Sequence, residues 1–214
     1  MSKTHRYYLG LDLGQTTDFT ALCVLERPRL TDPNEPDPIY ALRHLQRFPL
    51  GTPYPQIVRD VIALLKTPPM PGSLMAVDQT GVGRAVVDLF REAFDHKVTC
   101  RFVPITITSG HQVTRGNGSI MVPKKELVST LQVVLQTRRL QIARSLPDAE
   151  VLVREMENFK VKITTAGNET FDSWRQNIHD DLVLAVALAV WVAEQGMDSE
   201  RNSLKQNEER RYRR

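Results

Sequence analysis

The sequence has little cysteine, no signal peptide and no long apolar run, and each absence excludes a class of protein. Cys23 and Cys100 are the only cysteines in 214 residues. Neither belongs to a C-x-x-C pair, so a zinc site built from thiolates is not expected. The first residues lack the apolar core of a signal peptide, and the longest apolar run, Leu182–Ala193, is too short for a membrane span. We therefore expect a cytoplasmic protein that does not contact membranes.

The sequence also lacks a phosphate-binding loop of the form G-x-x-x-x-G-K-[ST], so nothing indicates a P-loop ATPase. Aromatic residues make up 7% of the chain and form no ladder for stacking on bases. The formal net charge of +3 is compatible with a polyanionic partner without requiring one. Hydrophobic and charged contents of 41% and 25% are ordinary for a globular domain.

Strand and helix patterns alternate along the chain and predict an α/β fold. Three antiparallel strands are followed by alternating helices and strands, which indicates a mixed sheet with helices on both faces. We assign residues 1–196 to one domain and 197–214 to a charged, disordered C-terminal tail. The expected strands are 7–12, 20–25, 39–48, 73–78, 101–106 and 140–142. The expected helices are 54–66, 82–94, one that begins at Pro123, 147–159 and 178–194. We expect a glycine-rich loop at 109–119 and a β-hairpin at 160–174.

Three aspartates stand at the ends of predicted elements. Asp12 ends the first strand, Asp78 ends a central strand, and Asp181 lies in the first turn of an otherwise apolar helix. Taken singly, each is explained as well by a turn or a helix cap. Together they fall at the edge of one sheet, where ligands bind in open α/β folds. Carboxylates are the ligands that Mg²⁺ and Mn²⁺ prefer, so the group predicts a metal site.

The residues around these aspartates resemble the nuclease domain of the large terminase subunit of tailed bacteriophages. The resemblance is carried by LGLDLGQTTDFTALCVLE (residues 9–26), LMAVDQTGVGRAVVDLF (74–90) and IHDDLVLAVALAVW (178–191), and it extends from Tyr7 to Trp191. The HDDLV stretch is its most specific part. The resemblance implies a ribonuclease H-like fold. It also implies a two-metal endonuclease that hydrolyses concatemeric viral DNA during genome packaging.

The resemblance assigns roles to the acidic residues. Asp12, Asp78 and Asp181 match the three acidic positions of the family and would hold two Mg²⁺ or Mn²⁺ ions, with Asp12 bridging them. Asp181 is preferred as the third ligand because it lies one residue further into the helix than Asp180. Asp180 and His179 are given supporting roles, and a helix cap is an equal alternative for His179.

Contacts with double-stranded DNA are expected to be mainly to phosphates, which implies weak sequence specificity. Each lysine or arginine proposed to contact DNA is also explained as an ordinary solvated surface residue. Lys160 and Lys162 alternate along a predicted strand and would share one face. The resemblance also implies a packaging ATPase, a small terminase or a portal protein as partners, in the cytoplasm of a bacterial host. The DNA-binding candidates are Arg84, Arg115, Lys124, Lys125, Lys160 and Lys162.

A full-length large terminase carries an ATPase motor whose phosphate-binding loop is missing here, so we expect an excised or a freestanding nuclease. A Holliday-junction resolvase shares the fold and the acidic site. A sugar-kinase-like or actin-like ATPase is suggested by GLDLGQTT (residues 10–17). A dinucleotide-binding module is suggested by Gly81 and Gly83, although Val86 stands where its third glycine would be. A non-catalytic DNA-binding or scaffold domain of a packaging complex is the last alternative.

Overall fold

A single mixed β-sheet organises the molecule. The computed structural model describes residues 4–14, 18–81, 83–94, 98–116, 118–165 and 180–212. The strands are β1 (His5–Asp12), β2 (Ala21–Pro28), β3 (Tyr40–Arg47), β4 (Leu74–Asp78), β5 (Arg101–Thr108), β6 (Thr114–Gly116), β7 (Ser119–Pro123) and β8 (Leu140–Ile142). The helices are α1 (Tyr54–Lys66), α2 (Gly83–Ala93), α3 (Lys124–Gln136), α4 (Ala149–Thr165) and α5 (Asp181–Tyr212).

The eight strands are ordered β6-β7-β5-β4-β1-β2-β3-β8. β1, β2 and β3 form an antiparallel meander. β4, β5 and β7 extend the sheet in parallel from β1, and β8 lies parallel to β3 at the opposite end. The predicted mixed α/β sheet is therefore confirmed. The parallel neighbours β4 and β5 are joined through α2, the kind of crossover connection that parallel strands need.

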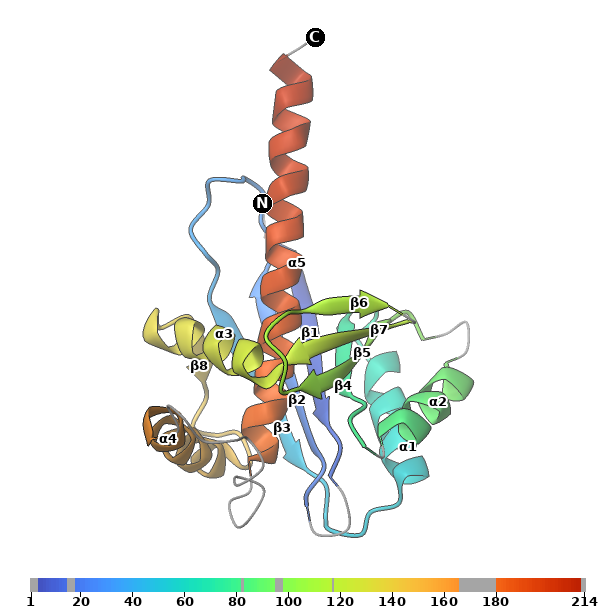
Figure 1. The fold of residues 1–214 in the computed structure, drawn as a ribbon. Coiled ribbons are helices and arrows are strands. Elements are labelled where there is room, and N and C mark those ends of the chain that lie inside the picture. The colour runs from blue at the N-terminus through green and yellow to red at the C-terminus, as the bar shows by residue number, and fades with distance from the viewer. Residues whose placement is uncertain are drawn as a thin grey trace.

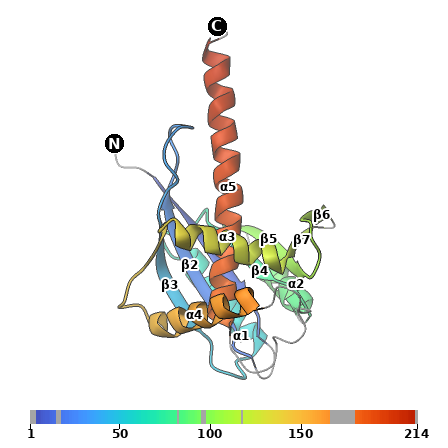
Figure 2. The same ribbon diagram turned by 60° about the vertical axis from the view of Figure 1, so that its left-hand side comes forward.

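Helices cover both faces of the sheet, with α3, α4 and α5 on one side and α1 and α2 on the other (Figure 1). The alternation of side chains along each strand creates two cores. In β1, Tyr8 belongs to the core beneath α5, while Leu9 and Leu11 belong to the core beneath α1 and α2. In β2, Cys23 and Val24 divide in the same way. A 60° rotation shows α5 lying along the sheet (Figure 2).

A glycine lets α5 approach β1 closely. A Cβ atom built on Gly10 would lie 1.9 Å from the carbonyl oxygen of Ala185, so no other residue fits without a backbone shift. The first half of α5 is buried on all sides, as its sequence predicts. Asp181–Asn207 is, among the described residues, long and apolar enough to span a membrane, and 72% of its apolar window is buried inside the protein.

The helix α5 is longer than predicted. Residues 197–212, expected to be a disordered tail, continue the helix to Tyr212 and project beyond the sheet (Figure 1). This segment contains neither glycine nor proline and is rich in strong helix formers such as glutamate, arginine and lysine. Contacts with the loop between β2 and β3 also stabilise it: Arg201 donates to Asp37 Oδ1 at 2.7 Å.

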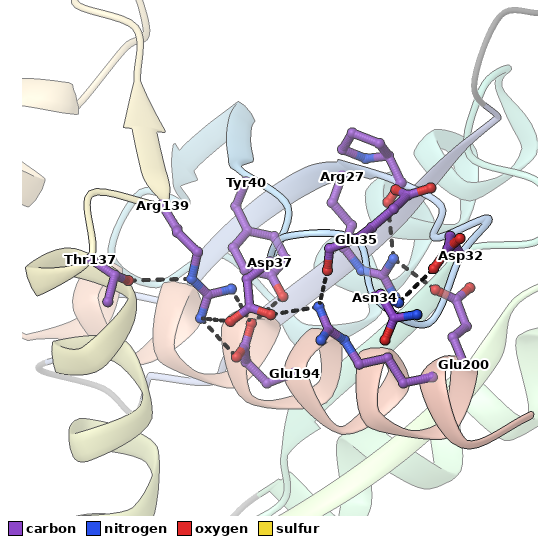
Figure 3. Close-up of polar contacts among 12 residues, drawn as sticks. Arg27, Asp32, Asn34, Glu35, Asp37, Tyr40, Thr137, Arg139, Glu194 and Glu200 are labelled. Carbon is purple, nitrogen blue, oxygen red and sulfur yellow. Dashed lines mark hydrogen bonds and ion pairs between the residues drawn. The ribbon is translucent and has the colours of Figure 1, made fainter. Parts of the chain in front are cut away.

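A buried ion pair joins this part of α5 to the sheet. Arg27 is completely buried, and its Nη1 atom lies 2.9 Å from Glu200 Oε2. Arg6 and Arg29 also pair with the Glu200 carboxylate. Figure 3 shows Arg27 directed toward Glu200 on α5. Because a buried charge without a partner is costly, this pair holds the helix to β2.

We expect Glu200→Gln to lower the free energy of unfolding by about 2 kcal/mol, because the buried Arg27 guanidinium loses its negatively charged partner even if the glutamine oxygen still accepts its hydrogen bond. Urea denaturation followed by circular dichroism measures the change. Asp198→Asn, at an exposed position of the same helix, is the control and should unfold like the parent. Equal stability of Glu200→Gln and the parent would show that this end of α5 is not docked on Arg27.

Two further segments differ from the sequence-based expectations. Part of the predicted glycine-rich loop pairs as β6 with β7 in an antiparallel ladder. The strand predicted for Lys160–Thr165 is wrong, because α4 continues through these residues to Thr165. The second strand of that predicted hairpin, residues 169–174, lies outside the described residues.

Candidate functional site

Asp12 and Asp78 end two adjacent parallel strands. The β1–β4 register pairs Leu11 with Val77, so the next residue of each strand is an aspartate. Neighbouring strands lie about 4.8 Å apart. Side chains alternate along a strand, and Asp12 follows Gly10, which faces α5, by two residues. Both carboxylates therefore belong to the face of the sheet that α5 covers.

The first turn of α5 brings Asp181 to the same place. Ala185 lies over Gly10, and Asp181 precedes Ala185 by four residues, on the same face of the helix. That step along the helix is about 6 Å, and the two-residue step from Gly10 to Asp12 along the strand is about 7 Å. The helix runs antiparallel to β1, so Asp181 is carried toward Asp12. Asp181 is 5% exposed and Asp12 is 7% exposed.

The charges of these carboxylates act on one another. Burial raises the pKa of Asp12 well above its ordinary value, and the negative charges of Asp78, Asp181 and Asp180 raise that pKa further. Lys124, the first residue of α3, acts in the opposite direction. Its Nζ atom lies 3.7 Å from Asp180 Oδ2. The structure thus brings the three predicted aspartates together with Asp180, the residue predicted to support them.

Asp78 is also the turn residue that the alternative interpretation expected. Its Oδ1 atom accepts the Thr80 backbone N–H at 2.8 Å and the Thr80 hydroxyl at 2.5 Å. The Thr80 hydroxyl oxygen in turn accepts the backbone N–H of Ile107 on β5. Asp78 can therefore serve both as a turn residue and as a member of the acidic cluster, because the turn holds its carboxylate in one orientation at the end of β4.

Two residues that the sequence interpretation missed complete the site. Arg47 ends β3, and its Nη2 atom lies 3.2 Å from Asp181 Oδ2 and also pairs with Glu155 of α4. Glu155 Oε2 accepts the backbone N–H of Val183 in the first turn of α5. Burial raises the pKa of Glu155 to about 7, although Arg47 lowers it.

The position of Arg47 at a strand end was a signal that could have revealed it. The antiparallel registers pair Asp12 with Ala21 and Ala21 with Arg47, so Arg47 lies at the same edge of the sheet as Asp12. Glu155 carries no comparable signal, because a glutamate in a helix of mixed polarity looks like a surface residue until the packing is known.

The predicted DNA-binding residues are not all equivalent. Lys124 is half-buried and belongs to the acidic site. Lys125, beside it on α3, and Arg84, in the first turn of α2, are exposed. Arg115 is exposed on β6 and donates to Gln195 Oε1 at 3.1 Å. Lys124 and Lys125 directly follow β7, and Arg84 lies in the first turn of α2, after the turn that follows β4.

Three predicted site residues cannot be placed at this edge. Lys160 and Lys162 are in the helical segment of α4 rather than on a strand, so the alternation that would give them a common face does not apply. Their side chains and His179 lie outside the described residues.

The chemistry of the site fits hard divalent cations. Among the described residues, no group of three or more His, Cys, Asp or Glu side chains is already arranged as a metal site. The donors present are nevertheless carboxylates, which Mg²⁺ and Mn²⁺ prefer. The pKa of Asp12 is raised by its burial and by the like charges around it, and a bound cation would relieve the repulsion between those charges.

A cavity of about 380 Å³ lies elsewhere in the molecule. Its walls include Arg6 and Tyr8 of β1, Leu74 of β4, Arg101 of β5 and Glu200 of α5. These residues lie toward the opposite ends of the strands from Asp12 and Asp78. The cavity contains none of the four aspartates, so the candidate site is defined by its charged groups rather than by the volume of this cavity.

The fold and the acidic edge define a ribonuclease H-like domain. The sequence model of the family described as the terminase RNaseH-like domain matches residues 9–191, and the chain belongs to this family. The crystal structure of the large terminase nuclease from thermophilic phage G20c superposes with a TM-score of 0.54 at 18% identity, over 86% of this chain and 81% of that chain. This likeness supports the ribonuclease H-like fold.

The Holliday junction resolvase of fowlpox virus gives a TM-score of 0.41 at 9% identity, over 92% of this chain and 99% of that chain. This similarity is too low to support an argument about fold or function. The comparison with curated proteins finds no match.

Proposed function

We propose that this chain is a metal-dependent DNA endonuclease in which Asp12, Asp78 and Asp181 hold two divalent cations, Mg²⁺ or Mn²⁺. The observation that carries the proposal is the burial of Asp12 among the charges of Asp78, Asp180 and Asp181, at one edge of a ribonuclease H-like sheet. A protein gains no stability from such a cluster of like charges. Bound cations would offset the repulsion between the carboxylates, which explains why the carboxylates are clustered.

The residues of the chain would bind the cations and fix the orientation of the carboxylates that hold them. Bound divalent cations stabilise the attacking and leaving oxygens of an in-line phosphoryl displacement. Asp12, on which the charges of both Asp78 and Asp181 act, would hold the cations together with these two residues. Thr80 orients the Asp78 carboxylate through two hydrogen bonds. The packing of α5 on Gly10 sets the distance of Asp181 from the sheet.

The proposed substrate is double-stranded DNA, which membership in the terminase RNaseH-like family supports. In particular, the chain would cut concatemeric viral DNA during genome packaging. Lys125, Arg84 and Arg115 are exposed and would contact phosphates, and Lys160 and Lys162 stay predictions. Phosphate contacts carry no direct sequence information, so weak sequence preference follows. A packaging ATPase, a small terminase or a portal protein would be the partner, in the cytoplasm of the bacterial host.

A plasmid-cleavage assay tests the proposal. We expect the purified protein to nick or linearise supercoiled DNA with Mg²⁺ or Mn²⁺, to stop when EDTA is added, and to resume when excess metal is restored. Intact DNA under all metal conditions would refute nuclease activity of the isolated chain. Nucleotide hydrolysis without DNA cutting would instead favour the ATPase alternative, and strong preference for four-way junctions over linear duplex would favour a resolvase.

A further inference from the structure

We propose that Arg47 is a positioning residue of the acidic site, which holds the Asp181 carboxylate in the orientation that binds a divalent cation while Glu155 anchors Arg47 from the other side. This inference rests on the proposed function. It gives a role to two charged residues that the metal ligands themselves do not require: the half-buried Arg47 and the buried Glu155.

The contacts of Arg47 join three elements of the fold. Its Nη2 atom contacts Asp181 Oδ2 on α5 at 3.2 Å and pairs with Glu155 Oε1 on α4. The other Glu155 oxygen accepts the Val183 backbone N–H at 3.2 Å. Arg47 and Glu155 therefore bind both a side chain and the backbone of the first turn of α5, which is the turn that carries Asp181.

Arg47 is itself held firmly. Its guanidinium lies over the Phe19 ring, with 4.8 Å between the guanidinium carbon and the ring centroid. Its backbone N–H donates to Asp148 Oδ2 at 3.3 Å. The side chain is 16% exposed, so little solvent screens its interaction with Asp181. These features distinguish Arg47 from a surface arginine that only balances charge.

The metal affinity distinguishes two roles for Arg47: positioning the Asp181 carboxylate, or only balancing its charge. A positive guanidinium near Asp181 repels a divalent cation, so removing a mere counter-charge should tighten metal binding. Removing a positioning residue frees Asp181 to rotate, and residues that orient metal ligands typically contribute a factor of about 10–100 in metal affinity. The two roles predict opposite signs for the same substitution.

The experiment is a Mn²⁺ titration of the metal-free protein by isothermal calorimetry, with Mn²⁺ electron paramagnetic resonance as a second readout. We expect Arg47→Met to weaken Mn²⁺ binding roughly tenfold. Arg47→Lys should bind with intermediate affinity, because lysine keeps the charge but lacks the planar fork. Arg43→Met is the matched control on the same strand, because Arg43 pairs with Glu26 at the surface, and it should bind like the parent.

Arg47→Met leaves the Glu155 carboxylate buried without its partner, so the protein could unfold. The double variant Arg47→Met/Glu155→Gln removes that charge, and it should fold and still bind Mn²⁺ more weakly than the parent. Unchanged or tighter binding by the folded variants would overturn the positioning role, while parental metal binding and DNA cutting would leave the proposed function standing. Absence of Mn²⁺ binding by the parent would overturn both.

Discussion

Asp78→Asn is expected to reduce DNA cleavage by about a thousandfold while the protein stays folded. Cations at such sites contribute several kcal/mol of transition-state charge stabilisation, and each 1.36 kcal/mol corresponds to about a factor of ten in rate. Asparagine keeps the oxygen that accepts the two Thr80 hydrogen bonds, so the turn after β4 should survive. The loss should therefore appear in plasmid cleavage with Mg²⁺ or Mn²⁺ and not in the thermal unfolding of the metal-free protein.

The control for this substitution is Asp88→Asn. Asp88 is an exposed aspartate on α2 whose partner is Arg91 in the same helix. Exposed pairs of this kind contribute little stability, so cleavage and unfolding should both match the parent. If Asp78→Asn cut DNA as fast as the parent, the assignment of the site would be wrong even though the nuclease activity remained.

Gly10→Ala is expected to destabilise the fold by about 3 kcal/mol, at the upper end of the usual cost of overpacking a core. The added Cβ would lie 1.9 Å from the Ala185 carbonyl oxygen and 2.9 Å from the Ala189 nitrogen. Both atoms belong to the backbone of a buried helix, so no side-chain rotation relieves the clash. The helix α5 would have to move away from β1 and carry Asp181 away from Asp12.

Chemical denaturation of Gly10→Ala measures this destabilisation, and plasmid cleavage by the folded fraction should also fall. Gly116→Ala is the matched control for stability. A Cβ at Gly116 meets no atom within 4 Å, and surface changes of this kind usually alter stability by less than about 0.5 kcal/mol. A Gly10→Ala protein as stable as the parent would contradict the direct packing of α5 on β1.

The choice between Asp180 and Asp181 shows how far sequence reasoning reached. The preference for Asp181 followed from its place one residue further into the helix. In the structure Asp181 shares a helix face with Ala185, which packs on Gly10, and contacts Arg47. Asp180 lies beside Lys124 but still raises the pKa of Asp12. A supporting position for Asp180 stays a prediction.

The wrong expectations concern segments whose state depends on distant contacts. Lys160–Thr165 begins with the alternation of polar and apolar residues that is typical of a strand, yet these residues continue the helix α4. Residues 197–212 have the composition of a disordered tail, yet α5 extends through them and is held by pairs such as Arg27 with Glu200. Local composition does not reveal a partner 173 residues away in the chain.

The amino-acid sequence by itself determined the order of most strands and helices and the place of each aspartate at the end of an element. Periodicity and turn residues are local, so they can be read without knowledge of the fold. Only the tertiary structure decided that Asp12, Asp78 and Asp181 meet on one face. It also decided that Arg47 and Glu155 join them, because strand register and helix docking depend on contacts between residues far apart in the chain.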